Sequence, residues 1–336
     1  MTQPRFSIGI DLGTTNSAIA FVPLSEEVAT EVLAVPQYDT ASTVAEAATL
    51  PSFLYLPEPA VAASLKTLVP GGKSWIVGRL ALRKSGETPD RVAHSAKSWL
   101  CHHAADRSAP FLPWGSDSLS LEDKISPVSA SARILAHLRW AWNARFAARG
   151  ADFAFDAQDI TITVPASFDA AAQRLTLSAA QEAGFPMRVR LLEEPQAAFY
   201  GWLEQQSRSG LDPWAGLSDP QGGAHHILVV DIGGGTSDFS LFERSRKKAA
   251  FILRRVAVSE HILLGGDNID LAIAHRMEPR LVKEGDKLSA RQWDHLVARC
   301  RSLKEQVLGV DGAHGYYPVW PVVCRRAKKS GPQWCH

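Results

Sequence analysis

Two copies of one short motif, far apart in the chain, constrain the fold more than any other feature. Apolar residues alternate on both sides of the run Asp-Leu-Gly-Thr-Thr at residues 11–15, and the same design returns in Asp-Ile-Gly-Gly-Gly-Thr at 231–236. Alternation on both sides of a glycine turn predicts a β-hairpin. The copies are two and lie 231 − 11 = 220 residues apart, which excludes a short-period repeat protein and indicates a duplicated fold with two facing halves.

The sequence between and around the copies predicts the domain organisation. A length of 336 residues has room for two or three domains. We expect a first lobe at 1–205 with an inserted subdomain at 36–124, where Pro, Gly and Ser interrupt short apolar runs. A connection at 206–223 leads to a second, incomplete lobe at 224–308, followed by an atypical tail at 309–336.

Local signals predict the elements of the first lobe. Ser126 and Asp169 are expected to cap helices that run to about Arg149 and Ala183, the second ended by Gly184. Residues 159–164 read as a strand, and residues 191–195 as a short strand end followed by a helix with Pro195 at its start.

Composition limits the partners. Lys plus Arg is 36 and Asp plus Glu is 35, so the net charge of +1 gives no general attraction to nucleic acid or to an acidic membrane. The four cysteines are widely spread, and no apolar run approaches about 18 residues. We therefore expect a cytoplasmic, monomeric protein without nucleic-acid or membrane binding, in which any anion site is local.

The motif residues themselves predict a polyphosphate site. A glycine turn lets backbone N–H groups approach phosphate oxygens, and threonine hydroxyls add donors. Asp11 and Asp231 would repel bare phosphate, so they make sense beside it mainly if Mg²⁺ lies between, held through water. A single copy would fit an ordinary tight turn equally well, whereas two matching copies favour a clamp for a polyphosphate.

Other motifs are weaker. The run Gly-Gly-Lys-Ser at 71–74 resembles the end of a Walker loop but lacks its earlier glycine, because Thr67 stands there. Cys101-His102-His103 and His225-His226 lack the ligand spacing of a structural zinc site.

Several ordered blocks resemble the nucleotide-binding domain of the 70-kDa heat-shock protein family, the DnaK-type chaperones. The two motifs are similar to the family's phosphate loops, and residues 160–166, 192–198 and 264–270 match the blocks between and after them. The resemblance covers residues 5 to 308 and implies an α/β, actin-like ATPase fold of the duplicated ribonuclease H-like type, with two lobes around a cleft that binds ATP or ADP with Mg²⁺. It also implies ATP hydrolysis and a co-chaperone or nucleotide-exchange protein as a partner.

Roles carry over residue by residue. The resemblance implies a catalytic group, a nucleotide-binding group and a pair of metal-holding carboxylates. The catalytic group is Lys97, which positions the attacking water, with Glu194, Asp231, Asp238 and Thr236. The nucleotide-binding group is Gly13, Thr14, Thr15, Gly233, Gly234, Gly235, Thr236, Gly265, Gly266 and the ribose-contacting Lys304, and the metal pair is Asp11 and Asp231.

The chain departs from the family pattern near its end. The acid expected three positions before Lys304 is Arg301, and the small polar residue expected four positions after it is Leu308. The later adenine-binding block and the peptide-binding domain are not found, so the resemblance indicates an ATPase domain truncated after about residue 308, with residues 309–336 either an out-of-frame end or a genuine tail. A catalytically weak, nucleotide-dependent interaction module (a pseudo-ATPase) and a sugar or acid kinase of the same superfold remain alternatives.

Overall fold

The computed structural model describes residues 3–26, 28–65, 75–102, 105–210, 225–247, 250–260, 262–283 and 285–308. The Walker-like run at 71–74, His103, the tail at 309–336 and all of the expected connection beyond residue 210 lie outside these residues. The expected start of that connection, at residue 206, falls inside a helix that continues to Arg208.

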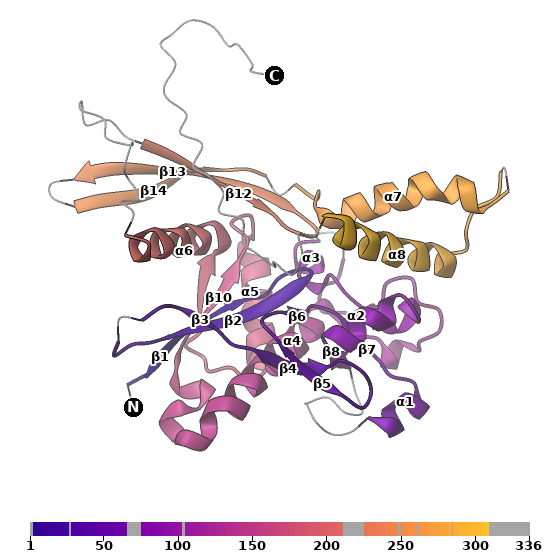
Figure 1. The fold of residues 1–336 in the computed structure, drawn as a ribbon, viewed down its shortest axis with the longest axis horizontal. Helices are drawn as coiled ribbons and strands as arrows, with labels where there is room; N and C mark the ends of the chain where they lie inside the picture. The colour runs from indigo at the N-terminus through magenta and orange to yellow at the C-terminus, as the bar shows by residue number, and fades with distance from the viewer. Residues whose placement is uncertain are drawn as a thin grey trace, which may run out of the picture.

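A six-stranded mixed sheet forms the centre of the first half. Its strands are β1 (Phe6–Asp11), β2 (Asn16–Pro23), β3 (Glu31–Val32), β6 (Leu50–Pro51), β10 (Asp159–Val164) and β11 (Arg190–Glu193). The order is β11-β10-β1-β2-β3, with β6 paired to β2. The predicted hairpin is confirmed, since β1 pairs antiparallel with β2, and β10 lies parallel to β1 on its other edge (Figure 1).

Three long helices belong to this half: α4 (Pro127–Phe146), α5 (Ala170–Glu182) and α6 (Glu194–Arg208). Both predicted N-caps are confirmed. The Ser126 hydroxyl accepts a hydrogen bond from the Ser129 N–H at 3.0 Å, and the Asp169 carboxylate accepts one from the Ala172 N–H at 2.7 Å. Gly184 follows α5 with φ at +79°, a left-handed conformation that favours glycine and ends the helix.

Helix α4 covers one face of the β1–β2 hairpin. The Trp142 ring lies 5.4 Å from the ring of Phe6 and 5.3 Å from that of Phe21, both edge to face. Ile8 and Ile10 are fully buried in the same core. This core fixes the end of β1, where Asp11 begins the first motif.

The segment between β3 and α4 contains short elements. They are β4 (Val35–Tyr38), β5 (Val44–Ala47), β7 (Leu54–Tyr55), α1 (Pro59–Ser64), β8 (Ile76–Val77), α2 (Arg79–Ser85), β9 (Val92–Ala93) and α3 (Ala96–Leu100). Leu50, Leu54 and Val77 belong to the main core, whereas Tyr38, Phe53 and their neighbours form a small core of their own. The separate subdomain at 36–124 stays a prediction.

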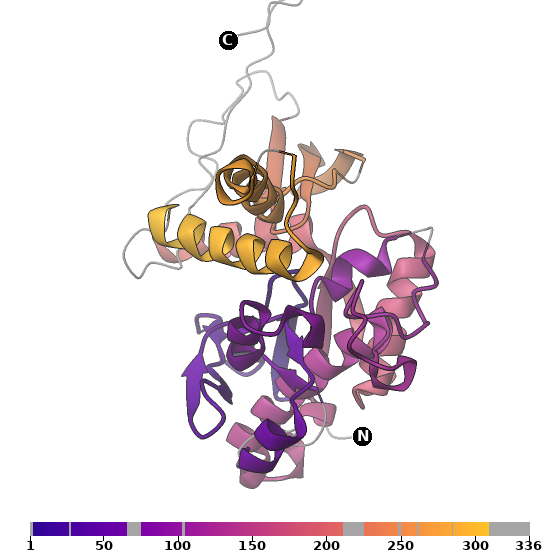
Figure 2. The same ribbon diagram turned by 90° about the vertical axis from the view of Figure 1, so that its right-hand side faces the viewer.

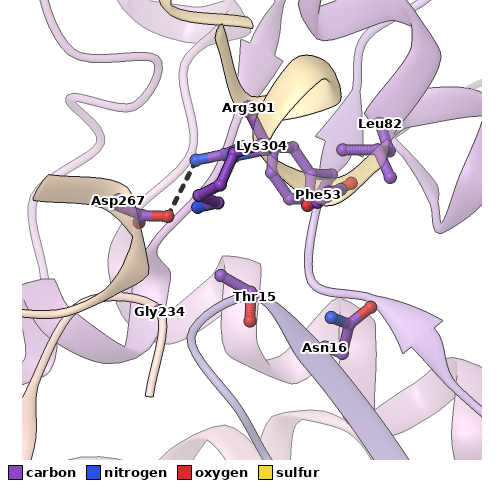
Figure 3. Close-up of a pocket in the computed structure, with 9 residues that line it drawn as sticks. Thr15, Asn16, Phe53, Leu82, Gly234, Asp267, Arg301 and Lys304 are labelled. Carbon is purple, nitrogen blue, oxygen red and sulfur yellow. Dashed lines mark hydrogen bonds and ion pairs between the residues drawn. The ribbon is translucent and has the colours of Figure 1, made fainter. Parts of the chain in front are cut away.

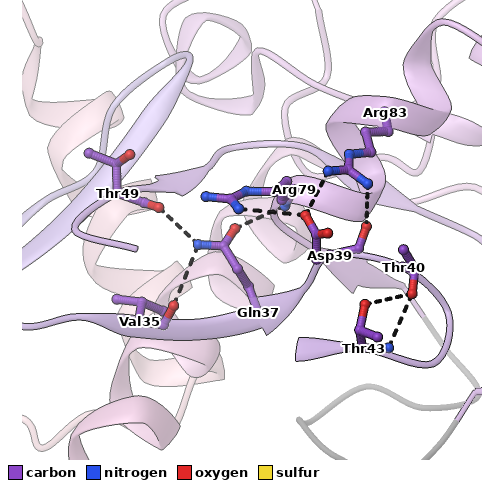
Figure 4. A network of polar contacts seen from close by, with 8 residues as sticks. All are labelled: Val35, Gln37, Asp39, Thr40, Thr43, Thr49, Arg79 and Arg83. Atoms are coloured by element: carbon purple, nitrogen blue, oxygen red, sulfur yellow. Dashed lines mark hydrogen bonds and ion pairs between the residues drawn. The ribbon is translucent and has the colours of Figure 1, made fainter. Parts of the chain in front are cut away.

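A buried glutamine connects the β4–β5 hairpin to α2 (Figure 4). The Gln37 side chain donates to the Thr49 carbonyl at 2.9 Å and accepts from the Arg79 N–H at 2.9 Å. Asp39 lies 2.7 Å from the Arg83 guanidinium and 3.5 Å from that of Arg79. Because Gln37 is fully buried with both ends of its amide bonded, it positions the start of α2 at a low cost in desolvation.

The second motif forms a second sheet. Strands β12 (His225–Ile232), β13 (Ser237–Lys247) and β14 (Ala250–Val258) pair antiparallel in that order, so the second predicted hairpin is also confirmed. Helices α7 (Gly266–Leu281) and α8 (Ala290–Leu308) pack on each other beyond one end of this sheet (Figures 1 and 2). Helix α6 lies between the two sheets, with the Phe199 ring stacked on that of Phe242 at 5.8 Å.

The architecture is therefore mixed α/β with several sheets, as the predicted actin-like class requires. Within the described ranges, no helix combines the length and the apolar character needed to cross a membrane.

Candidate functional site

The two motif turns meet each other. An ideal Cβ placed on Gly234 would lie 2.2 Å from Cγ2 of Thr15, and one on Gly235 would lie 3.3 Å from Cγ2 of Thr14. At Gly13, a Cβ would lie 1.9 Å from the Asn16 carbonyl oxygen of its own turn. Cβ atoms do not approach other atoms below about 3.0 Å. Glycine at 13 is therefore required by the shape of its own turn, and glycine at 234 by the contact between the two turns.

A serine from the inserted segment supports the first turn. The Ser52 hydroxyl donates to the Gly13 carbonyl at 2.7 Å, and its backbone N–H donates to the Thr15 carbonyl at 2.8 Å. Sequence reasoning missed Ser52, because the residue follows β6 and reaches the turn only through the pairing of β6 with β2.

Two further hydroxyls join the first motif. The Thr163 hydroxyl on β10 donates to the Asp11 carboxylate at 3.0 Å, since the parallel register places these residues side by side. Ser98, next to Lys97 on α3, has its hydroxyl 3.4 Å from that of Thr14. The alternating strand pattern at 159–164 was a usable signal for Thr163, but only the register between β1 and β10 identifies its partner.

The predicted glycine pair after β14 packs on the second turn. A Cβ on Gly265 would lie 2.5 Å from the Gly234 carbonyl oxygen and 2.6 Å from that of Gly233. The N–H of Gly266 donates to the Gly233 carbonyl at 3.0 Å, and the N–H of Asp267 donates to the Gly234 carbonyl at 2.7 Å. The structure thus joins the second turn to the start of α7 by backbone contacts that only glycine at 265 permits.

Lys97 forms an ion pair with Glu194. Lys97 lies on α3, Glu194 is the first residue of α6, and both side chains are largely buried. Burial alone would lower the pKa of Lys97, but Glu194, Asp11 and Asp231 outweigh it and raise that pKa, so the ammonium group stays charged. Burial raises the pKa of the Glu194 carboxyl, and Lys97 opposes that rise. A cation is therefore held among three carboxylates from three separate elements.

The carboxylates also act on one another. Burial raises the pKa of Asp231, Lys97 lowers it, and the nearby charges of Asp11 and Asp238 raise it further. Asp238 is buried on β13 directly opposite Asp231. Carboxylate and hydroxyl oxygens are hard donors that suit Mg²⁺, and mutual repulsion between acids is relieved by a divalent cation. In the part of the chain that is described, no group of three or more His, Cys, Asp or Glu residues is arranged to hold a metal directly.

Thr236 closes the second turn through its backbone. Its carbonyl accepts the N–H of Gly233 at 2.8 Å, and the following strand β13 begins one residue later. This bond closes a tight turn of glycines between β12 and β13, at the place that corresponds to residues 12–15 between β1 and β2.

Lys304 belongs to a buried cluster of four charges, of which Figure 3 shows Lys304, Arg301 and Asp267. Its ammonium nitrogen donates to the Gly266 carbonyl at 2.7 Å and forms an ion pair with the fully buried Asp270 at 2.7 Å. Arg301, where the resemblance leads one to expect an acid, donates to Asp267 at 2.9 Å and to Asp270 at 3.2 Å. The formal charges of these two cations and two carboxylates cancel, so the arginine replaces the expected acid without leaving a net charge.

A small cavity of about 130 Å³ lies beside this cluster. It is lined by Thr15, Asn16, Phe53, Leu82, Gly234, Asp267, Arg301, Lys304 and Glu305. The Arg301 guanidinium stands 5.3 Å from the centre of the Phe53 ring, so α8 touches the small core of the inserted segment. Phe53 carried no sequence signal, because a lone aromatic residue in an irregular region is usually part of the core.

The structure therefore joins nearly all predicted residues through two sets of contacts. One set links the two turns, the Gly265–Gly266 pair and Lys304. The other is the Lys97–Glu194 ion pair, whose charges act electrostatically on Asp11 and Asp231, while Asp238 acts on Asp231.

Comparison with known proteins gives a consistent result. The family model for "Hsp70 protein" matches residues 112–309. A chaperone protein HscA homolog of Actinobacillus pleuropneumoniae is 32% identical over 282 residues, covering 81% of this chain and 37% of the relative. The HscA homolog of Photobacterium profundum is 31% identical over 300 residues, covering 86% of this chain and 40% of the relative.

The chain thus spans about two fifths of the length of the curated relatives it matches. The two glycine turns, the strands that carry them and the match over most of the chain lead to one conclusion: this chain belongs to the Hsp70 family.

Proposed function

We propose that the chain binds Mg·ATP between its two motif turns and hydrolyses it. The observation that carries the proposal is the placement of the Lys97–Glu194 pair among Asp11 and Asp231, beside two glycine turns that touch. In this proposal the two sheets and their helices are two lobes around the nucleotide, with lobe boundaries near residues 205 and 224.

Each turn contributes a different part of the phosphate site. The N–H groups of residues 13–15 and 233–236 bind phosphate oxygens, and the hydroxyls of Thr14, Thr15 and Thr236 add donors. Asp11 and Asp231 hold Mg²⁺ through water, and the ion, when bound, neutralises charge on the phosphates. Lys97 stays protonated among the carboxylates and offsets charge that develops as water attacks the γ-phosphate, while Glu194 and Asp238 orient that water.

The nucleoside side is the weaker part of the site. In this proposal the Gly265–Gly266 pair, packed on the second turn, lies close to the nucleotide, and Lys304 contacts the ribose. Arg301 already uses two of its donors on Asp267 and Asp270. We therefore expect most of the affinity to come from phosphates and magnesium, with modest discrimination between adenine and other bases.

The wider role follows from the relatives. Proteins named as HscA chaperone homologs suggest that this chain is the ATPase part of a chaperone system, acting in the cytoplasm as a monomer with a co-chaperone or nucleotide-exchange protein. Peptide binding is not assigned to these residues.

The test combines calorimetry with phosphate release on the purified chain. Mg·ATP should bind and release phosphate, EDTA should weaken binding, and Asp231→Asn should abolish the magnesium dependence. Asp117→Asn changes an exposed acid that is not among the site residues and serves as the matched control. It should change neither Mg·ATP affinity nor phosphate release. ATP binding that is the same with and without magnesium would contradict the proposed site.

One observation favours a second candidate, a nucleotide-dependent interaction module that turns over poorly. Arg301 occupies the position where the resemblance leads one to expect an acid, and its guanidinium is paired with Asp267 and Asp270. Tight Mg·ATP binding without phosphate release would select this candidate. Phosphate transfer to a sugar or carboxylic acid would instead select a kinase.

A further inference from the structure

A second pocket, of about 470 Å³, lies in the first half of the chain. Its lining consists of Trp99, Phe111 and Trp114 together with His102, Asp106 and two alanines, and we call it the aromatic pocket. It shares no lining residue with the cavity beside Lys304. Small-ligand sites usually have volumes of about 300 to 1,000 Å³ and a mainly apolar or aromatic lining with few polar groups. The aromatic pocket has this size and this lining, and the proposed phosphate chemistry does not use it.

Three aromatic rings form one side of the pocket. The ring of Trp99, on α3, lies 5.0 Å from that of Phe111 and 5.2 Å from that of Trp114. The Phe111 plane stands at 73° to Trp99 and at 89° to Trp114, so the rings meet as a corner and not as a flat stack. Trp99 and Phe111 also pack against the main core. The corner is therefore held in place by the fold before any ligand binds, which lowers the entropic cost of binding.

The third ring is largely open. Trp114 is 69% exposed, although two other rings contact it. A tryptophan that only anchored its segment would bury most of its surface, since burial is what makes such an anchor stabilising. Aromatic faces carry partial negative charge and attract cations, and tryptophan does so most strongly. The exposed indole therefore favours a cationic ligand over a neutral apolar one.

A carboxylate supplies the matching charge. Asp106 lines the pocket, and its Oδ1 accepts a hydrogen bond from the Ser108 N–H at 3.0 Å. The neighbouring Arg107 donates to the Leu100 carbonyl at 2.8 Å and is not among the lining residues. Among the described residues that line the pocket, Asp106 is the only carboxylate and none is Lys or Arg. The local field therefore favours a positive charge in the pocket.

Shape and hydrogen bonding decide which class of cation fits. A guanidinium or a primary ammonium brings several N–H donors that need acceptors, and the lining side chains offer only the Asp106 carboxylate and the His102 ring. A guanidinium is also planar and suits a flat stack. A quaternary ammonium has no N–H donor and is rounded, so it can contact two rings of a corner at once.

We propose that the aromatic pocket binds a quaternary ammonium group, whose methyl groups contact the rings of Trp99, Phe111 and Trp114 while Asp106 provides the opposite charge. Free choline-like molecules and trimethyllysine side chains both carry this group, and the experiment distinguishes them. The proposal does not depend on nucleotide binding or hydrolysis.

The first probe is choline, compared with its neutral isostere in which carbon replaces the nitrogen. Binding of each to the full chain is measured by saturation-transfer NMR. The two molecules have the same shape and differ in charge, so choline should bind saturably and at least about threefold more tightly than the isostere. A smaller difference would overturn the proposal.

The second probe is a short peptide that contains one trimethyllysine. Saturable binding of either ammonium probe supports the shared chemistry, and the tighter of the two identifies its source as a free molecule or a protein side chain. Binding of neither probe would overturn the proposal.

Variants assign the binding to the pocket. Trp114→Ala should weaken choline binding at least about threefold, and Trp114→Phe, which keeps a ring, should retain part of the affinity. Asp106→Asn should weaken the binding of choline but not that of the isostere, because it removes the charge and keeps the shape. Asp117→Asn, at an exposed acid that does not line the pocket, should bind choline like the parent.

Urea unfolding separates a lost contact from a lost fold. Asp106 is exposed on a turn, so Asp106→Asn should keep the urea midpoint of the parent and remains a valid test if Trp114→Ala is less stable. Choline binding equal to that of the parent in either folded variant would overturn the proposal.

Discussion

Replacing Lys97 by alanine tests the proposed chemistry most directly. The Lys97 and Glu194 side chains are only 10% and 17% exposed, and the charges of Asp11 and Asp231 also act on the ammonium group. Losing one preorganised charge stabiliser typically slows catalysis about 10²-fold to 10³-fold, about 2.7 to 4 kcal/mol. We expect Lys97→Ala to lower the single-turnover rate of ATP hydrolysis by at least about 100-fold, while Mg·ADP affinity changes by less than about tenfold.

The same substitution removes one partner of a buried pair and so affects stability. Breaking such a pair costs about 3 to 5 kcal/mol, because the remaining charge is left unpaired. Adding Glu194→Gln removes that unpaired carboxylate, so the double variant should recover much of the lost unfolding free energy without recovering the rate. Urea unfolding of the parent, both single variants and the double variant measures this separation.

Lys84→Ala is the matched control for Lys97. Lys84 pairs with the exposed Glu87, an interaction worth about 0 to 1 kcal/mol. Its loss should leave hydrolysis unchanged. Equal single-turnover rates for Lys97→Ala and the parent would remove Lys97 from the mechanism, and an equal loss in Lys84→Ala would show that the effect is not specific to the site.

Three further outcomes follow from contacts in the site. Gly234→Ala should weaken Mg·ATP binding in calorimetry, because its Cβ would lie 2.2 Å from Thr15 Cγ2. Adding Thr15→Ser, which removes that methyl group, should restore part of the affinity. Gly9→Ala, where a Cβ meets nothing within 4 Å, should bind Mg·ATP like the parent. Burial raises the folded-state pKa of Asp231 above its ordinary 3.8. The parent therefore loses stability as the pH rises from about 3.8 through the folded-state pKa, because the unfolded chain ionises this carboxyl more readily. Asp231→Asn should consequently be more stable than the parent at pH 7 in EDTA. That gain should vanish below about pH 3.8, as measured by urea unfolding across pH, since both chains are then neutral at this position. Arg301→Ala should lower the unfolding free energy by about 3 to 5 kcal/mol, because it leaves buried carboxylates less compensated, and no change in the urea midpoint would refute the charge cluster.

The nucleoside side of the site is where this chain departs from the family pattern. The position three residues before Lys304, where the resemblance leads one to expect an acid, carries Arg301, which donates hydrogen bonds to Asp267 and Asp270. Nucleotide specificity is therefore the property for which the family resemblance is the least reliable guide.

The sequence by itself determined the local features. Alternation around the glycine turns at 11–15 and 231–236 predicted both hairpins, and Ser126 and Asp169 predicted the starts of two helices, because these signals act within a few residues. The order of the blocks also pointed to the family.

Tertiary structure alone decided which distant groups meet. The β1–β10 register brings Thr163 to Asp11, and the fold brings Lys97 on α3 to Glu194 at the start of α6. No local pattern contains either contact. Burial is of the same kind: Ile8 and Leu228 hold corresponding apolar positions in the two hairpins, yet Ile8 is 0% exposed and Leu228 is 47% exposed. Local conformational propensity depends on short runs of residues. Burial and charge pairing depend on which distant residues the fold brings next to a side chain.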